Sequence, residues 1–300
     1  MITNPNVKIN LGLNILRKRE DGFHDLETLF VPYFGIHDTL EIVVGDDYSR
    51  TSAALFGKYA PEMIAQGISE DGALMITIAR AEGVDWDPLK DLTAKAYYIL
   101  AEDFKLPPVK IFLEKTSPVG AGLGGGSADA AFALKMLNEM CGLGLCETQL
   151  AEYAARLGSD CPLFIYNRPM IGEGRGEILS EISWELPFSC HPEHSEGSFD
   201  LQVLTPEGIA VSTKEAYGGI RPHLPEVPLR EALARPVEEW SDVLVNDFEE
   251  TVFVNHPELA AIKRSLYDSG AVYASMSGSG SALFALYKKE KKFKEKEKCD

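Results

Sequence analysis

The sequence predicts an α+β fold in two domains. Residues 7–15 and 109–115 alternate apolar and polar side chains, which is the period of a half-buried strand. Residues 130–141 place apolar side chains at helical spacing instead. Near residues 185–200 the composition shifts to Pro, His and Ser, as in a surface loop or linker, and a second group of strand and helix patterns follows. A chain of 300 residues can hold one large domain or two ordinary ones.

The first half of the chain predicts strands around a few helices. Its expected elements are strands over 7–15, 27–33, 38–44 and 109–115 and a helix over 92–104, which Pro107 and Pro108 end. Residues 45–90 have no clear period, because Gly, Pro and Asp interrupt them. On the first strand we expect one apolar face and one polar face. The apolar face would hold Val7, Ile9, Leu11, Leu13 and Ile15.

A glycine-rich loop over 118–127 leads into the next helix, which Gly142 is well placed to end. Later expected elements are a helix over 147–157, a strand over 201–204, a helix over 258–268, a small-residue loop over 275–281 and a strand over 282–287. We therefore predict an N-terminal domain over 1–175 and a C-terminal domain over 176–288, the latter a smaller sheet with helices on one side. A tail over 289–300 is nearly all Lys and Glu.

Charge and cysteine content exclude several classes of protein. The formal net charge of −17 argues against a protein that mainly grips nucleic acid or an anionic membrane surface. The 5 cysteines include no C-x-x-C pair, so neither a zinc site nor a disulfide framework is expected. The start of the chain lacks the pattern of a signal peptide, and no apolar run is long enough for a membrane helix. A cytoplasmic location is the expectation.

The loop Pro118–Ser127 carries the strongest chemical signal. Glycine dominates it, and it lies between an expected strand and an expected helix. Glycine lets successive backbone N–H groups turn inward, and the helix start adds free N–H groups and a positive dipole end. Such a loop is suited to hold phosphate. We expect Ser127 to cap the helix and to present its hydroxyl to a phosphate or to Mg²⁺.

Three other interpretations of this loop compete. Gly120, Gly122 and Gly125 match a dinucleotide fingerprint with Glu139 further on, but that pattern alone is weak. The loop also approaches a P-loop, except that Gly126 stands where the lysine is needed, which excludes a Walker A motif. A turn without a ligand is the third possibility. It would not require so many glycines, each of which costs backbone entropy.

Two further segments offer polar side chains, each with a simpler explanation. Lys8 and Asn10 share one face of the first strand, and that face could simply meet solvent. Asp160 follows the end of an expected helix, where an aspartate is often only a cap or a turn former. The second loop, SMSGSGS, is ambiguous by itself.

Taken together, these segments resemble the GHMP kinases. PVGAGLGGGSADA is similar to their ATP phosphate loop, and SMSGSGSALFAL to their third motif. PNVKINLGLNILRKREDGFHDLETLF, LGSDCPLF and GEGRGEIL are similar to the branch that phosphorylates the 2-hydroxyl of 4-diphosphocytidyl-2-C-methyl-D-erythritol, on the non-mevalonate route to isoprenoid precursors. The resemblance spans about residues 5–287. It implies an N-terminal part like domain 2 of ribosomal protein S5, a ferredoxin-like C-terminal part, ATP and Mg²⁺ as cofactors, and a small-molecule acceptor with a cytidine diphosphate group.

The resemblance also implies roles for individual residues. Asp160 matches the general base, and Lys8 the residue that holds it ionised. Asn10, Phe23 and His24 match substrate contacts, with Phe23 keeping the stacking face of the tyrosine usual in the family. No metal ligand is implied. The ATP-binding loop would comprise Pro118, Val119, Gly120, Ala121, Gly122, Leu123, Gly124, Gly125, Gly126, Ser127 and Ala128.

Two departures from the family pattern leave alternatives open. Asp91 stands where the family tends to have an asparagine near the nucleotide base, and residues 186–200 look unlike the family, so no site residue is placed there. The acceptor could instead be that of another GHMP kinase, such as homoserine or mevalonate. The chain could also be a catalytically inactive member that only binds ligands, although the presence of both Lys8 and Asp160 speaks against this. The sequence predicts no oligomeric state.

Overall fold

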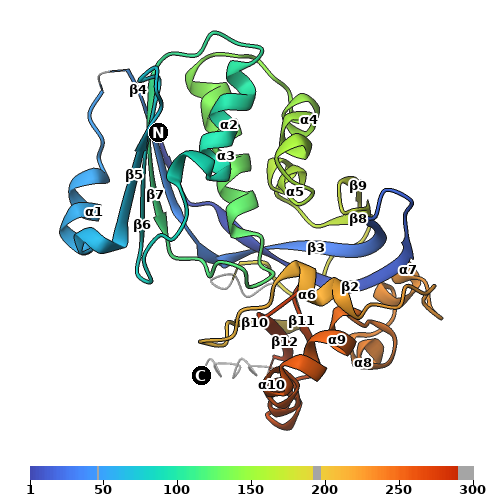
Figure 1. Ribbon diagram of the computed structural model, residues 1–300. Coiled ribbons are helices and arrows are strands. Elements are labelled where there is room, and N and C mark those ends of the chain that lie inside the picture. Colours follow the sequence, from blue (N-terminus) through green and yellow to red (C-terminus); the bar gives the residue numbers. More distant parts are fainter. Residues whose placement is uncertain (46, 192–196, 290–300) are drawn as a thin grey trace, which may run out of the picture.

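The structure, a computed structural model, describes residues 1–45, 47–191 and 197–289, which form three β-sheets with helices packed on them (Figure 1). The charged tail beyond Lys289 and part of the composition shift near 185–200 lie outside the described residues. Three short 3₁₀ turns, Pro61–Met63, Pro88–Lys90 and Val237–Glu239, connect longer elements.

The N-terminal half is built on a five-stranded sheet in the order β1-β4-β7-β6-β5, in which only β6 and β7 are parallel neighbours. Helices α2 to α5 lie on one side of it and α1 on the other (Figure 1). The strands are β1 (Ile2–Thr3), β4 (Thr39–Val44), β5 (Ile64–Ile68), β6 (Leu74–Arg80) and β7 (Val109–Lys115). The helices are α1 (Ser52–Lys58), α2 (Leu92–Ala101), α3 (Gly125–Met140), α4 (Glu147–Leu157) and α5 (Cys161–Tyr166).

The alternation of β7 explains how this sheet separates two apolar layers. Ile111 and Leu113 are fully buried on the side of α2 and α3, together with Leu134 of α3. Phe112 points to the other side, where Leu55 of α1 covers it. The expected strands and helices of this half are present. The stretch 45–90, which has no clear period, holds α1, β5 and β6, and β5 is a half-exposed edge strand that presents little apolar pattern.

A second sheet, in the order β2-β3-β8-β9, lies between the two halves of the molecule (Figure 1). Its long hairpin pairs β2 with β3 over most of their length, and β8 extends it. The predicted domain boundary at 175/176 falls in the turn between β8 and β9. The strands are β2 (Asn6–Lys18), β3 (His24–His37), β8 (Met170–Gly174) and β9 (Ile178–Glu181).

A β-bulge at Gly12 changes which side of β2 each residue faces. The register with β3 shifts between Leu11 and Leu13, and Gly12 has φ +66°. Val7, Ile9 and Leu11 therefore pack in one cluster, whereas Leu13 and Ile15 pack in another. The expectation of a single apolar face over residues 7–15 was wrong, because an inserted residue reverses the alternation. The expectation of a half-buried strand also fails, because Lys8 and Asn10 are both only 3% exposed.

The C-terminal half contains the sheet β10-β12-β11, with β10 (Phe199–Leu204), β11 (Tyr273–Met276) and β12 (Leu283–Lys288). Met276 and Leu283 face the helices α6 (Thr213–Gly218), α9 (Phe248–Asn255) and α10 (Pro257–Asp268). Tyr273 and Phe284 face the opposite way, toward α7 (Leu229–Leu233), α8 (Trp240–Val243) and the apolar side of β2. Both faces of this sheet are therefore covered, whereas the sequence analysis predicted helices on only one side of it.

Gly12 offers a test of this packing. A Cβ at Gly12 would lie 2.7 Å from Leu229 Cδ1, whereas Gly72, with a similar φ of +69°, has nothing within 4 Å. Gly72→Ala should cost only the left-handed backbone penalty, about 1–2 kcal/mol. Gly12→Ala should cost about 1–3 kcal/mol more, because the C-terminal half must shift. Urea unfolding of both variants measures the difference, and equal losses would contradict this account of the bulge.

Candidate active site

Two glycine-rich loops from opposite halves of the chain touch each other. One joins β7 to α3 and the other joins β11 to β12. A Cβ at Gly122 would lie 2.1 Å from the carbonyl oxygen of Ser277, so only glycine allows this approach. The backbone N–H of Ala282 donates to the Ala121 carbonyl at 3.1 Å, and the Ser277 hydroxyl donates to the Gly122 carbonyl at 3.1 Å. The loops therefore form one backbone-lined surface.

The phosphate loop ends in a left-handed turn. Gly124 has φ +72° and is the N-cap of α3, which begins at Gly125. Ser127 consequently lies inside the first turn and does not cap the helix, contrary to the sequence prediction. The backbone N–H of Ala128 already donates to the Gly124 carbonyl at 2.9 Å. Helix α3 thus points its free N–H groups, which lie before Ala128, at the loop.

Lys8 is fixed by three oxygen atoms. Its Nζ donates to Asn10 Oδ1 at 2.5 Å and to the Gly122 carbonyl at 2.9 Å, and it lies 3.4 Å from Asp160 Oδ2. Burial lowers the pKa of Lys8, and the Asp160 carboxylate opposes that shift. The backbone N–H of Lys8 also donates to the Leu123 carbonyl at 2.9 Å, which docks β2 on the loop. The face of β2 that could have met solvent is therefore part of the site.

Asp160 has the freedom that a reacting group needs. It is the N-cap residue of α5, yet its side chain makes no capping hydrogen bond within the described part of the chain. The side chain is 30% exposed and faces Lys8. The alternative of a simple helix cap does not hold. An ionised carboxylate beside a buried ammonium group can accept a proton from an alcohol, provided that the alcohol binds in front of it.

Asn10 connects Lys8 to the rest of the hairpin. Its Nδ2 donates to Thr28 Oγ1 at 3.2 Å, while its Oδ1 accepts from Lys8. The backbone N–H of Asn10 donates to Ser277 Oγ at 3.3 Å. Both ends of the amide are engaged by protein, so the structure gives Asn10 a clear part in orienting Lys8.

Lys8 and Asp160 open on a cleft of about 840 Å³ between the two halves. The phosphate loop, Trp86 and Asp91 before α2, and Arg175 and Tyr217 line it as well. Leu123 and Ala128 belong to the predicted ATP set but do not line the cleft, because their side chains are buried in the cores on either side. The predicted loop residues that line it are Pro118, Val119, Gly120, Ala121, Gly122, Gly124, Gly125, Gly126 and Ser127.

A side pocket of about 640 Å³ adjoins the cleft and contains Phe23 and His24. The His24 ring stacks on Tyr217 with centroids 4.8 Å apart, and the Arg175 guanidinium lies 4.9 Å from the Phe23 centroid. Burial lowers the pKa of His24, with Lys18 adding to the effect. Burial, with the charge of Asp160, raises the pKa of Tyr217 to about 12. The pocket therefore presents a neutral imidazole, a phenol and an aromatic face.

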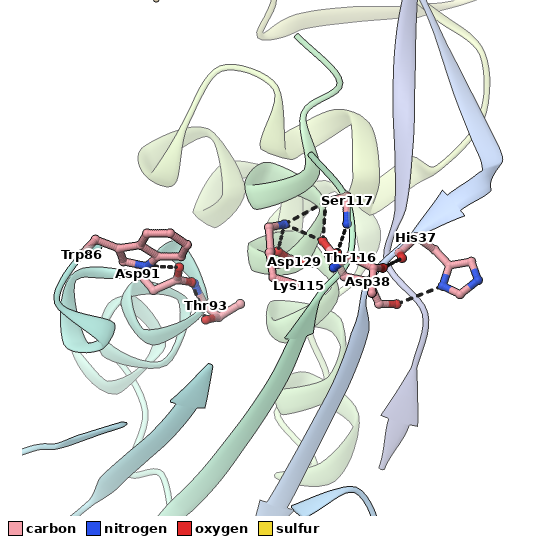
Figure 2. A network of polar contacts seen from close by, with 9 residues as sticks. All are labelled: His37, Asp38, Trp86, Asp91, Thr93, Lys115, Thr116, Ser117 and Asp129. Atoms are coloured by element: carbon pink, nitrogen blue, oxygen red, sulfur yellow. Dashed lines mark hydrogen bonds and ion pairs between the residues drawn. The ribbon is translucent and has the colours of Figure 1, made fainter. Parts of the chain in front are cut away.

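Beneath the loop lies a buried ionic cluster that the sequence analysis did not find (Figure 2). Lys115 donates to Asp38, to Asp129 Oδ2 at 2.6 Å and to Ser117 Oγ at 3.1 Å. Asp38 also accepts the backbone N–H groups of Thr116 and Ser117 at 2.7 and 2.6 Å. The cluster ties the end of β7 to the first turns of α3. It thereby holds both ends of the phosphate loop.

The charges of this cluster do not balance. One ammonium group faces two carboxylates, and Asp129 Oδ1 is buried without a hydrogen-bond partner among the described residues. Burial raises the pKa of Asp129 well above its ordinary value; Lys115 opposes the rise and Asp38 adds to it. Asp38 accepts further hydrogen bonds from the backbone N–H groups of Thr116 and Ser117 and from the Ser117 hydroxyl, donors that Asp129 does not share.

Asp91 is fully engaged where the family tends to have an asparagine. Its Oδ1 accepts from the Thr93 backbone at 2.9 Å and caps α2, and its Oδ2 accepts from Trp86 Nε1 at 3.0 Å (Figure 2). The indole of Trp86 is thereby held at the cleft. Trp86, Lys115, Arg175 and Tyr217 are site residues that sequence reasoning missed. Of these, Arg175 stood in the segment GEGRGEIL and Lys115 at the end of the expected strand over 109–115, but neither was assigned to the site.

Comparison with known proteins gives the family. Residues 91–168 match the family model described as GHMP kinases N terminal domain, and residues 229–298 match GHMP kinases C terminal. A relative from Bacteroides thetaiotaomicron is 45% identical over 290 residues, covering 97% of this chain and 93% of its own. The chain belongs to the GHMP kinase family. The sequence prediction is thus confirmed, together with the two-part GHMP architecture.

Other relatives agree at greater distance. The Bacteroides thetaiotaomicron protein and one from Nitratidesulfovibrio vulgaris are both named 4-diphosphocytidyl-2-C-methyl-D-erythritol kinase; the latter is 34% identical, covering 94% of this GHMP kinase and 88% of its own chain. A solved 4-(cytidine 5'-diphospho)-2C-methyl-D-erythritol kinase matches with TM-score 0.70 and 27% identity, over 95% of this chain and 90% of its own. Homoserine kinase from Cytophaga hutchinsonii, 16% identical with TM-score 0.62 over 95% and 86% of the two chains, shares the fold.

The described residues contain no group of three or more His, Cys, Asp or Glu side chains placed to hold a metal ion. Within the same residues, no helix has the length and apolar character to cross a membrane.

The ionic cluster predicts an unusual pH dependence. The raised pKa of Asp129 in the folded state makes the free energy of unfolding fall as pH rises above the usual carboxyl range. The reason is that the unfolded chain releases this proton at a lower pH than the folded chain does. Asp129→Asn removes this cost, so near neutral pH it should be about 1–2 kcal/mol more stable than wild type. The advantage should shrink toward pH 4. Asp38→Asn, which loses backbone hydrogen bonds, should be less stable than wild type throughout. Urea unfolding between pH 4 and 8 checks both, and a constant difference for Asp129→Asn would contradict the assignment.

Proposed function

We propose that this GHMP kinase transfers the γ-phosphoryl group of ATP to the 2-hydroxyl of 4-diphosphocytidyl-2-C-methyl-D-erythritol. One observation carries the proposal. Lys8 and Asp160 face each other beside the phosphate loop, and the cleft that holds them adjoins a pocket with an aromatic face and a histidine. A kinase for a small alcohol needs only the Lys8–Asp160 pair beside the phosphate loop. A kinase whose acceptor carries a pyrimidine nucleotide also needs the adjoining pocket.

In the proposed reaction, Asp160 accepts the hydroxyl proton while the alcohol oxygen forms a bond to the γ-phosphorus. The bond from that phosphorus to the bridging oxygen breaks, and ADP leaves. Lys8 holds its ammonium charge 3.4 Å from the Asp160 carboxylate and stabilises the charge that develops on the transferred group. Three oxygen acceptors fix the Lys8 ammonium group, so it need not reorganise during the step.

The phosphates of ATP would lie on the two glycine loops. Positive-φ glycines and the start of α3 direct backbone N–H groups into the cleft. Mg²⁺ usually keeps water and phosphate ligands and takes few protein ligands, which suits a cleft without a preformed carboxylate cage in its described residues. Ser127, which lines the cleft at the loop, is the hydroxyl that would reach it; the ion would neutralise phosphate charge.

The side pocket would take the cytosine. Phe23 offers a stacking face, and neutral His24 has one donor and one acceptor nitrogen for the edge of the base. Homoserine or mevalonate would leave this pocket empty. The reaction would take place in the cytoplasm, where the cysteines stay reduced; the cysteines that the structure describes form no disulfide.

Asp160→Asn tests the chemical step. Asparagine keeps the size of the side chain but cannot accept the proton, so kcat should fall about 10²–10⁴-fold. ATP affinity, measured by calorimetry, should stay within a few-fold of wild type. Asp103→Asn, an exposed carboxylate outside the cleft, is the control. Turnover of Asp160→Asn within a few-fold of wild type would remove Asp160 from the mechanism.

A coupled assay tests the acceptor. The cytidylylated methylerythritol should be phosphorylated far faster than homoserine or mevalonate, and cytidine analogues should bind better than uridine analogues by about 5- to 150-fold. His24→Ala should narrow that gap, whereas His223→Ala, outside the pocket, should not. Equal use of cytidine and uridine acceptors by wild type would contradict the proposed substrate.

A further inference from the structure

Arg175 stands where the cleft and the side pocket meet. The residues that line both cavities in the described structure are Gly158, Ser159, Arg175, Thr213 and Tyr217, and among these only Arg175 is positively charged. On the proposed function, the reacting hydroxyl lies at Asp160 and the base lies at Phe23. The diphosphate between them must then cross this junction.

The turn that carries Arg175 is built against the catalytic carboxylate. It connects β8 to β9, and Gly176 donates its backbone N–H to the Glu173 carbonyl at 3.0 Å to close it. Gly176 has φ +107°, and a Cβ there would lie 3.3 Å from the Phe30 ring and 3.8 Å from Asp160 Oδ1. The turn therefore places Gly176, the residue that follows Arg175, next to the Asp160 carboxylate.

The guanidinium of Arg175 now covers the surface that a base would use. It lies 4.9 Å from the Phe23 centroid, while its side chain is 41% exposed and meets Glu177 only at 3.5 Å. This is a loosely held cation. Of the other cations that line the two cavities in the described structure, Lys8 pairs with Asp160, Lys115 with Asp38 and Asp129, Arg156 with Glu102 at 2.5 Å, and Lys90 with Asp87 at 3.8 Å. Lys214 lines only the side pocket and not the junction.

We propose that Arg175 binds the diphosphate of the acceptor, and that in doing so it leaves the face of Phe23 and frees it for the pyrimidine. A guanidinium makes two parallel hydrogen bonds to a phosphate group, which are stronger than its contact with an exposed aromatic ring. A nucleoside without phosphates has no group to draw Arg175 away. The same side chain then excludes nucleosides and admits nucleoside diphosphates.

The test compares cytidine with CDP by calorimetry, with a non-hydrolysable ATP analogue saturating the ATP site. Wild type should bind CDP more tightly than cytidine. In Arg175→Gln, CDP affinity should fall by about 10- to 100-fold. Cytidine affinity should stay equal or rise, because Phe23 is uncovered. Arg175→Lys keeps the charge but not the planar guanidinium group. Its affinity for CDP should therefore lie between those of wild type and Arg175→Gln.

Arg168→Gln is the matched control. Arg168 is similarly exposed at 42% and lies 2.7 Å from Glu181, but it lines neither cavity. It should change neither affinity. A merely structural role for Arg175 would weaken cytidine and CDP together, and that result would overturn the proposal. So would unchanged CDP affinity in Arg175→Gln.

Failure of the proposed function gives a different result. If wild type binds neither cytidine nor CDP, the cytidine acceptor itself is wrong and this inference falls with it. If wild type binds both equally well, the cytidine acceptor stands and the role of Arg175 is wrong. Steady-state kinetics give a second reading, because Arg175→Gln should raise KM for the acceptor while leaving KM for ATP unchanged.

Discussion

The contact between Gly122 and Ser277 is the constraint on which the site depends. It brings the Ser277 carbonyl oxygen, from the C-terminal half, within 2.1 Å of where a side chain on Gly122 would begin, and so joins the two halves at the phosphate surface. The Gly122 carbonyl, fixed by this contact, accepts from Lys8 and from Ser277. Lys8 in turn stands 3.4 Å from Asp160. One close backbone approach therefore sets the position of the loop, the ammonium group and the carboxylate together.

Two buried lysines, Lys115 and Lys8, lie near this contact with carboxylate partners, and their ion pairs by themselves add little to the free energy of unfolding. A buried lysine with partners costs desolvation that its ion pairs only partly offset. Lys115 stabilises the loop ends through Asp38, at the cost of a second buried carboxylate, Asp129, one oxygen of which has no hydrogen-bond partner among the described residues. Lys8 is buried on β2, where Asn10, two residues further along the strand, orients it. Such arrangements are better explained by the need to fix the geometry of the phosphate loop and of the reacting pair.

The sequence predicts those parts of the site that depend on local pattern. Glycine density marked the phosphate loop, and the resemblance assigned Lys8 and Asp160, which the structure brings together. Local pattern could not show that Gly12 inserts a bulge, because that depends on the register with β3. Local pattern also could not pair Lys115 with Asp38, because the alternation only placed Lys115 at the end of a strand. Tyr217 of α6 and Arg175 of the β8–β9 turn are far apart in the sequence, and only the packing of α6 against the hairpins brings them to the same pocket as His24.

The net charge of −17 poses the last physical question, since ATP and the proposed acceptor are both anions. Long-range attraction cannot hold them, because the protein as a whole repels them. Binding must come from local groups: backbone N–H groups on the glycine loops, which carry no net charge, and a few cations placed where phosphates would lie. Lys8 is buried, where the low local dielectric strengthens its field, and its pKa is lowered by that burial. Arg175 is exposed and loosely paired, so it can reach a second phosphate group without first breaking a strong ion pair. On the proposed function, the two cations would divide the work: the buried Lys8 would act on the group that reacts, and the exposed Arg175 on the group that identifies the acceptor.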